Sequence, residues 1–227
     1  MMEWEDKFKS NLLEVLYRAD QPRDEKGRWT SGGASAGSVE DSKVYNWALN
    51  KFGDAQTAKN FTEWFGDSKV VDADGNPMVV YHGTTADFDE FQRTMDVGPH
   101  FGTAEQAGVA AGVHEGDPKI MPVYLKMENP LRVTDEQANQ PSLLQDELIK
   151  RGLVPPDMKD IGFEPAGNIR IRNQLEGMGY DGLVYENTAE GPGDSYIVFN
   201  PTQIKSATGN VGTFDPNNPN ITLSDEE

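Results

Sequence analysis

The apolar residues of this chain fall in short runs that glycine and proline interrupt, and this spacing limits what it can fold into. Short apolar runs bounded by turn-forming residues are typical of strands. The 227 residues include 23 glycines and 14 prolines, and 36% are hydrophobic. Such a composition favours a loop-rich globule containing strands over a helix bundle.

The order of the expected elements predicts an α+β fold with one or two sheets. Strands are expected at 69–72, 77–82, 120–127, 182–186 and 195–199. A DADG turn would join the first two strands as a hairpin, and the loop TAEGPGD would join the last two. Helices are expected at 104–113, 142–151 and 168–177, with two short helices in 43–65 broken near Gly53.

Both ends of the chain differ in pattern from its middle. Residues 3–19 have the spacing of an amphipathic helix, and residues 20–40 are polar and read as a flexible linker. We therefore predict an N-terminal helix and linker over 1–40, a main domain over 41–215 and an irregular acidic tail over 216–227. The segment after Ser206 lacks periodicity and is expected to be irregular, draped on the domain or disordered.

Composition excludes some kinds of site and disfavours some partners. The chain has no cysteine, so it can form neither a disulfide nor a thiolate metal site. Its net charge is -18, which repels phosphate backbones and makes nucleic acid an unlikely partner unless a local basic patch exists. No stretch approaches a membrane span.

The N-terminal residues bear on the location of the protein. Glu3, Glu5 and Asp6 stand where a signal peptide would carry positive charge. We therefore expect no secretion signal and a cytoplasmic protein.

Three motifs carry candidate chemistry. In Tyr81-His82-Gly83-Thr84, glycine would let a ligand approach the backbone, and the histidine could hydrogen-bond a ribose hydroxyl; a structural histidine is the alternative. The second motif is Gly98-Pro99-His100-Phe101-Gly102-Thr103, which is either a tight turn with Phe101 in the core or a ring platform for a flat cation.

The third motif runs from Asp194 through Ser195-Tyr196-Ile197-Val198-Phe199-Asn200-Pro201 to Gln203 and Ser206. Strand alternation predicts one face made by Ser195, Ile197 and Phe199 and another made by Tyr196 and Val198. An ordinary core strand ending in a proline turn would also explain it.

Taken in this order, the three motifs resemble those of the ADP-ribosyltransferase superfamily. The resemblance covers roughly residues 45–215 and is closest to the phage and polymorphic-toxin branches, including domains at the ends of Mu-type head-morphogenesis proteins. It implies split mixed and antiparallel sheets with small helices around a cleft for NAD, which would be the substrate. It also implies a protein that is either cytoplasmic or carried by a virion into a host cell.

The resemblance also implies roles for single residues. His82 matches the histidine that bonds the NAD ribose, and Gly83 matches the glycine whose backbone holds the nicotinamide carboxamide. Tyr81, Thr84, Phe101 and Tyr196 would complete the NAD site. His100 stands where the family's second motif has tyrosine.

Ser195 stands where the family has its catalytic glutamate. Serine offers a hydroxyl but no charge, so Asp194, Glu186 or Glu190 could supply the carboxylate, and Gln203 could supply hydrogen bonds; the pattern does not choose among them. We count His82, His100, Ser195 and Gln203 as catalytic candidates.

These features favour a mono-ADP-ribosyltransferase, a phage or toxin effector, acting on a host protein. A weakly active or inactive NAD-binding module of a virion is a second reading, which Ser195 supports. A third is NAD hydrolysis or 2′-phosphotransfer, for which His82, His100 and Ile197 fit a His-His-hydrophobic pattern. Arg93, Arg170 and Arg172 could bind phosphate.

No metal site is expected, because the histidines lack ligand spacing and DADG does not complete a calcium loop. The pattern says nothing of oligomeric state.

Overall fold

A computed structural model describes residues 39–93, 96–113, 115–134, 141–156 and 165–222 of the chain. The predicted helix over 3–19 and nearly all of the predicted linker lie outside these residues. The described part has an α+β fold with two sheets, as the sequence predicts.

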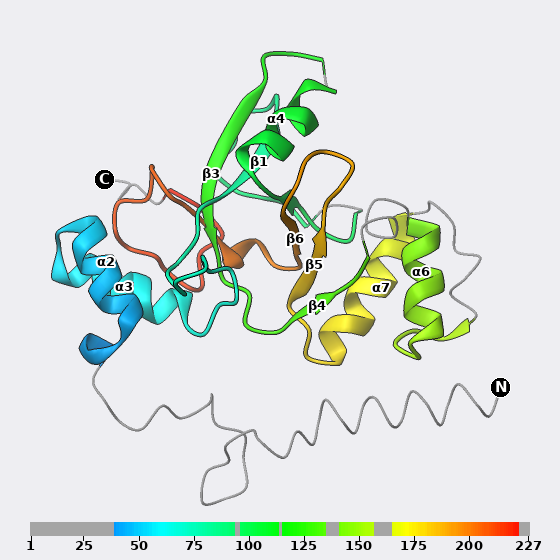
Figure 1. Ribbon diagram of the computed structural model, residues 1–227, viewed down its shortest axis with the longest axis horizontal. Coiled ribbons are helices and arrows are strands. Elements are labelled where there is room, and N and C mark those ends of the chain that lie inside the picture. Colours follow the sequence, from blue (N-terminus) through cyan, green and yellow to red (C-terminus); the bar gives the residue numbers. More distant parts are fainter. Residues whose placement is uncertain (1–38, 94–95, 114, 135–140, 157–164, 223–227) are drawn as a thin grey trace, which may run out of the picture.

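The helices and strands alternate irregularly along the chain (Figure 1). The α-helices are α2 (Lys43–Phe52), α3 (Ala55–Phe65), α4 (Ala104–Gly112), α6 (Pro141–Lys150) and α7 (Pro165–Gly177). Two short 3-10 helices, η1 and η3, span Val39–Asp41 and Pro201–Gln203. The strands are β1 (Val80–Thr84), β2 (His100–Phe101), β3 (Lys119–Leu125), β4 (Pro130–Arg132), β5 (Gly182–Glu186), β6 (Asp194–Val198) and β7 (Ile204–Ser206).

Local capping residues set the limits of the first helices. Ser42 and Asp54 accept hydrogen bonds from backbone N–H groups in the first turns of α2 and α3, which would otherwise lack partners. Gly53 takes the left-handed conformation (φ 73°) and ends α2, so the predicted break between the two helices is confirmed. Thr103 and Gln106 form a capping box at the start of α4.

The two sheets differ in composition. The three-stranded sheet has the order β1-β3-β7 and is antiparallel throughout. The four-stranded sheet has the order β2-β6-β5-β4, and only its β4–β5 pair is parallel. An antiparallel bridge between Tyr81 and Gly102 joins β1 of the first sheet to the end of β2 in the second.

The sheets and helices form four layers, because alternate side chains of a strand pack on opposite faces of its sheet. Side chains of both sheets meet in one apolar cluster, which includes Val123 and Leu125 of β3 and Tyr196 and Val198 of β6. Tyr124, between the two β3 residues, points to the opposite face and packs under α2 and α3. The layers are therefore α2 and α3, the three-stranded sheet, the four-stranded sheet, and then α6 and α7.

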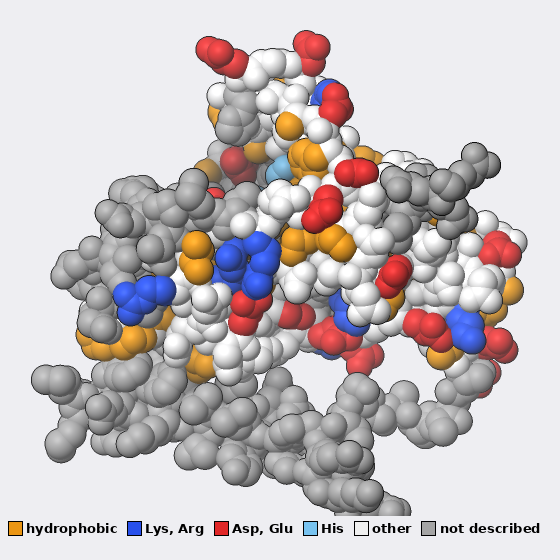
Figure 2. Space-filling model, turned by 180° about the vertical axis from the view of Figure 1, so that it is seen from behind, with side chains coloured by type: hydrophobic (Ala, Val, Ile, Leu, Met, Phe, Trp, Pro, Cys, Tyr) orange, Lys and Arg blue, Asp and Glu red, His pale blue; other side chains and the backbone are white. Residues whose placement is uncertain are grey.

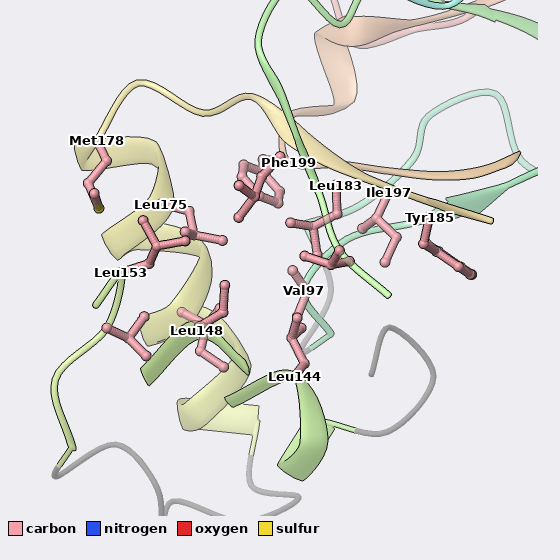
Figure 3. Packing of buried hydrophobic residues seen from close by; sticks show 14 residues of the cluster. Val97, Leu144, Leu148, Leu153, Leu175, Met178, Leu183, Tyr185, Ile197 and Phe199 are labelled. Atoms are coloured by element: carbon pink, nitrogen blue, oxygen red, sulfur yellow. The ribbon is translucent and has the colours of Figure 1, made fainter. Parts of the chain in front are cut away.

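The outer face of the four-stranded sheet is covered by α6 and α7 (Figure 3). Leucines of these helices, such as Leu148 and Leu175, meet Leu183 of β5 and Ile197 of β6. Phe199 follows β6 into the same cluster. The predicted division of β6 into an Ile197 face and a Tyr196 face is confirmed, and each face packs into a different core.

The predicted strand over 69–72 is wrong. The chain there makes one isolated bridge, Val71 to Pro77, although the hairpin turn exists and the Asp72 side chain accepts from the N–H groups of Asp74 and Asn76. Two hydrogen bonds close this bridge, from the N–H of Asp72 to the Asn76 carbonyl and from the N–H of Met78 to the Val70 carbonyl, but the N–H of Lys69 donates to the Met127 carbonyl instead of extending the pairing into a ladder. The next strand begins only at Val80, which puts His82 in the middle of β1 rather than at its end.

Residues 207–222, the described part of the segment after Ser206, are draped over the domain. Phe214 packs in the aromatic cluster of α2 and α3, and Ile221 lies in the core between the sheets. The buried Lys205 ammonium donates to the carbonyls of Asn218 (2.5 Å) and Asn220 (3.0 Å), and burial lowers its pKa to about 8. The boundary between residues 215 and 216 stays a prediction.

Helix α4 lies directly against β1 because Gly83 has no side chain. A Cβ atom on Gly83 would lie 1.9 Å from the carbonyl oxygen of Ala107 and 2.9 Å from the amide nitrogen of Ala111. Backbone atoms cannot move aside cheaply, so a methyl group there would push α4 off the strand.

We predict that Gly83→Ala lowers the free energy of unfolding by about 1–3 kcal/mol, the usual cost of overpacking. Gly108→Ala is the matched control on α4, because its Cβ would meet only the end of the Ile120 side chain at 3.9 Å. Alanine is the better helix former, so this control should gain about 0.5–1 kcal/mol. Chemical denaturation measures both, and equal effects would contradict the packing argument.

A second stability prediction concerns Tyr124, whose hydroxyl is buried and has no hydrogen-bond partner among the described residues. Tyr124→Phe should raise the free energy of unfolding by about 1 kcal/mol, because it removes an unsatisfied polar group and keeps the ring. Burial also raises the pKa of Tyr124 to about 12, so the unfolded chain loses this proton first above pH 10 and wild-type stability falls there. Denaturation at pH 7 and pH 11 should show a larger advantage for the variant at pH 11, and a less stable variant would contradict the assignment.

Candidate active site

A cavity of about 580 Å³ lies where the two sheets separate. Tyr81 and Gly102 exchange two backbone hydrogen bonds, of 2.8 and 3.0 Å, which join β1 to the residue that follows β2. Beyond them the chain turns into α4, and the space left open is the cavity. Its lining includes Tyr81, His82, Gly83, Phe88, Glu90, Phe91, Asp96, His100, Phe101, Gln106, Tyr185, Glu190 and Ser195.

Figure 2 shows the side-chain types on one face of the molecule, where pale blue histidine surface lies beside orange hydrophobic and red acidic side chains below the part that projects upward. The described lining residues include the carboxylates of Glu90, Asp96 and Glu190 but no lysine or arginine. The cavity therefore combines negative charge with aromatic surface.

The His82 ring is half-buried among three phenylalanines. Its centroid lies 5.0 Å from that of Phe91, 5.5 Å from that of Phe101 and 6.2 Å from that of Phe88. Nδ1 lies 2.8 Å from the carbonyl oxygen of His100. A carbonyl only accepts, so Nδ1 carries the proton and Nε2 is the acceptor nitrogen of the neutral ring.

Burial sets the charge of this ring. It lowers the pKa of His82 below the ordinary value of 6.5, and the hydrogen bond to the His100 carbonyl opposes the shift only in part. A neutral imidazole with one fixed donor and one acceptor is suited to accept a hydrogen bond from a sugar hydroxyl.

The backbone of Gly83 faces the cavity. Tyr81 directs both of its backbone groups to Gly102, away from β3. Residues two apart on a strand direct their N–H and C=O groups to the same edge. Gly83 therefore presents a donor and an acceptor at the edge that β2 has left, which is the arrangement that an amide ligand requires.

His100 and Phe101 point in different directions from β2. Phe101 is buried in the core between the sheets and touches the cavity beside His82. The side chain of His100 is 37% exposed, with Nε2 3.9 Å from Asp96 Oδ2. Burial lowers the pKa of His100, and the negative charges of Asp96 and Glu190 oppose this shift.

Ser195 is buried in a closed hydrogen-bond network. Its hydroxyl donates to Gln106 Oε1 and accepts from Asn187 Nδ2, both at 3.0 Å. The Gln106 amide also accepts from the N–H of Thr103 and donates to the carbonyls of Gly191 and Gly193. The serine is thus held by its neighbours at the wall of the cavity.

Three of the residues counted as catalytic or NAD-binding candidates do not line this cavity. Gln203 lies at η3, where its amide accepts from the N–H groups of Phe199 and Asn200 and donates to the carbonyls of Lys126 and Asp181. Tyr196 is buried in the core between the sheets, and burial raises its pKa to about 12. Thr84 accepts a hydrogen bond from the N–H of Ala86. Their predicted roles have no support in this geometry.

The three carboxylates among which the sequence did not choose lie in different surroundings. Asp194 forms a paired hydrogen bond with the Arg132 guanidinium, at 3.1 and 2.5 Å. Glu186, its register partner on β5, is exposed. Only Glu190 of these three lines the cavity.

The predicted phosphate-binding arginines also lie elsewhere. Arg93 donates to the Phe199 carbonyl and pairs with Glu176, and Arg172 donates to the carbonyls of Asp96 and Val97. Arg170, on α7, is not among the lining residues either. In the described residues, this cavity therefore offers no cationic phosphate grip.

The lining and supporting residues that were not predicted from the sequence include two phenylalanines and two amide side chains, besides Glu90 and Asp96. Phe88 and Phe91 come from the loop after β1, and Gln106 and Asn187 build the network around Ser195. Thr103-x-x-Gln106 is a capping-box pattern and could have been recognised. Phe88, Phe91 and Asn187 give no local signal, since only the fold brings them to the cavity.

Comparison with known proteins adds a family. A family model described as "ADP-Ribosyltransferase in polyvalent proteins" matches residues 72–214, more than half of the chain and all three motifs. No curated protein and no solved structure gives a significant match.

Among the described residues, no helix has the length and apolarity to cross a membrane. The same residues contain no group of three or more histidine or carboxylate side chains that could hold a metal ion.

The burial of His82 generates a pH prediction. An NMR titration should give this ring a pKa below 6.5, so that it is neutral at pH 7. Because the unfolded chain then takes the proton first as pH falls, stability that is complete above pH 6.5 should decline as the pH drops toward the folded-state value. A ring pKa at or above 6.5 would contradict the described environment.

Proposed function

Because the chain belongs to the family of ADP-ribosyltransferases in polyvalent proteins, we propose that it transfers ADP-ribose from NAD to an acceptor, as a phage or toxin effector. The observation that carries this proposal is that one cavity holds both the acceptor nitrogen of His82 and the backbone edge of Gly83 that is not directed to β3. The first suits a ribose hydroxyl, and the second suits the carboxamide of nicotinamide.

The side chains that line the cavity are also suited to the nicotinamide riboside half of NAD. Nicotinamide in NAD is a flat ring with a positive charge, which aromatic faces and carboxylates attract. Phe88, Phe91 and Phe101 supply aromatic surface, and Glu90 and Asp96 supply negative charge. We expect the nicotinamide riboside end to enter the cavity and the diphosphate to remain toward its mouth.

In the proposed reaction the bond between the nicotinamide nitrogen and ribose C1′ breaks, and its electron pair leaves with nicotinamide. A nucleophile of the acceptor forms the new bond to C1′ and releases its proton. His82 and Gly83 hold the sugar and the amide in place, which lowers the entropic part of the barrier. The strongly negative chain favours a protein acceptor over nucleic acid, and we propose a host protein.

A module that binds NAD without turning it over is the second candidate, and one observation favours it. Ser195 holds the position of the family's glutamate and is tied to Gln106 and Asn187. Nicotinamide release separates the two candidates, since the binding module would retain NAD unchanged. NAD hydrolysis would give free ADP-ribose, and 2′-phosphotransfer is disfavoured by the lack of lysine and arginine among the described lining residues.

The test uses the full chain with labelled NAD and a host lysate. We expect nicotinamide release and label on protein. His82→Ala should lower the rate of release by about 100-fold or more, because a preorganised hydrogen bond to the reacting sugar is lost. Unaltered circular dichroism would show that the fold is kept, and a rate within twofold of wild type would remove His82 from the mechanism.

A further inference from the structure

We propose that Glu190, in the loop between β5 and β6, supplies the catalytic carboxylate that the strand position of Ser195 lacks. The inference rests on the proposed NAD chemistry of the His82 cavity and names the residue that would stabilise its transition state.

The hydrogen bonds of Ser195 leave it little freedom to act on a substrate. Only 3% of the residue is exposed, its one proton goes to Gln106, and an amide proton of Asn187 occupies its oxygen. Glycine at position 102 permits this arrangement, because a Cβ there would lie 2.0 Å from Gln106 Oε1. Ser195 is therefore a support for its neighbours.

Asn187 connects this support to Glu190. The buried Asn187 amide donates one hydrogen to Ser195 Oγ at 3.0 Å and one to Glu190 Oε2 at 2.8 Å. Its Oδ1 accepts from the backbone N–H groups of Ala189 and Glu190, at 3.1 and 3.0 Å. Asn187 thus fixes both the backbone and the carboxylate of Glu190.

The loop that carries Glu190 is clamped from two sides. The N–H of Asn187 donates to the Gly193 carbonyl at 2.9 Å, across the loop. The Gln106 amide, from α4, donates to the carbonyls of Gly191 and Gly193. A carboxylate held this way needs little reorganisation when charge develops beside it.

The position of Glu190 fits the proposed chemistry. It lines the same cavity as His82, and its negative charge is felt at His100. Oε2 is bonded to Asn187, while Oε1 has no hydrogen-bond partner within the described part of the chain. As the glycosidic bond breaks and its electrons leave with nicotinamide, positive charge builds on C1′ and the ring oxygen of the ribose. The Glu190 carboxylate would stabilise this charge through space, without forming a bond to the sugar.

Glu190→Gln tests the proposal with the smallest change. Glutamine can still accept from Asn187 but carries no charge, so nicotinamide release should fall by about 100-fold or more. Calorimetry should show NAD affinity within a few-fold of wild type. Glu186→Gln is the matched control, since it removes one carboxylate from the exposed end of β5, outside the cavity lining, and should keep the wild-type rate.

Chemical rescue separates a catalytic charge from a structural role. Glu190→Ala should be slow, and added formate should restore part of its nicotinamide release, while chloride at equal ionic strength should not. Glu190→Gln at the wild-type rate, or equal slowing by Glu186→Gln, would overturn this inference and leave the proposed function standing. A wild-type chain that binds NAD but releases no nicotinamide would overturn both.

Discussion

Two backbone hydrogen bonds between Tyr81 and Gly102 hold the two sheets in register at one end, and the rest of the site depends on where they stop. The apolar core between the sheets is not directional, so it could tolerate small sliding of one sheet on the other. The bridge sets one relative position of β1 and β2. Immediately beyond it Thr103 starts α4, the strands part, and His82, Gly83 and the His100 carbonyl are left facing a common cavity.

A second constraint is the need to satisfy polar groups that the fold has buried. Gln106, Ser195 and Asn187 are each almost inaccessible, and together they use every proton of two amides and one hydroxyl. Such networks are stable only when complete, because each unpaired member would cost about 1–3 kcal/mol. The network described here includes the Glu190 carboxylate, which accepts from Asn187 and lines the cavity. The charge of the network therefore lies at the cavity.

The charges and aromatic rings of the cavity are consistent with the family, and they indicate which part of a dinucleotide the cavity would bind. Carboxylates and phenyl rings without lysine or arginine among the described lining would hold a cationic ring better than a diphosphate. Burial also keeps His82 neutral at pH 7, which preserves its acceptor nitrogen. In this cavity the negative charge comes from loops and the hydrogen-bonding groups from strands, so a departure from the family pattern at one strand position need not remove the charge.

Features that depend on near neighbours in the chain could be predicted from the order of the amino acids. Turn residues, apolar spacing and strand alternation predicted the α+β class, the break at Gly53 and both faces of β6, because these follow from backbone geometry within a few residues. Only the folded chain revealed the short strands β4 and β7, the position of Gln203 at η3 outside the cavity lining, and the presence of Glu190, but not Glu186 or Asp194, in that lining. Those outcomes depend on pairings between residues far apart in the chain, whose free energy is set by packing and buried hydrogen bonds and leaves no local pattern to read.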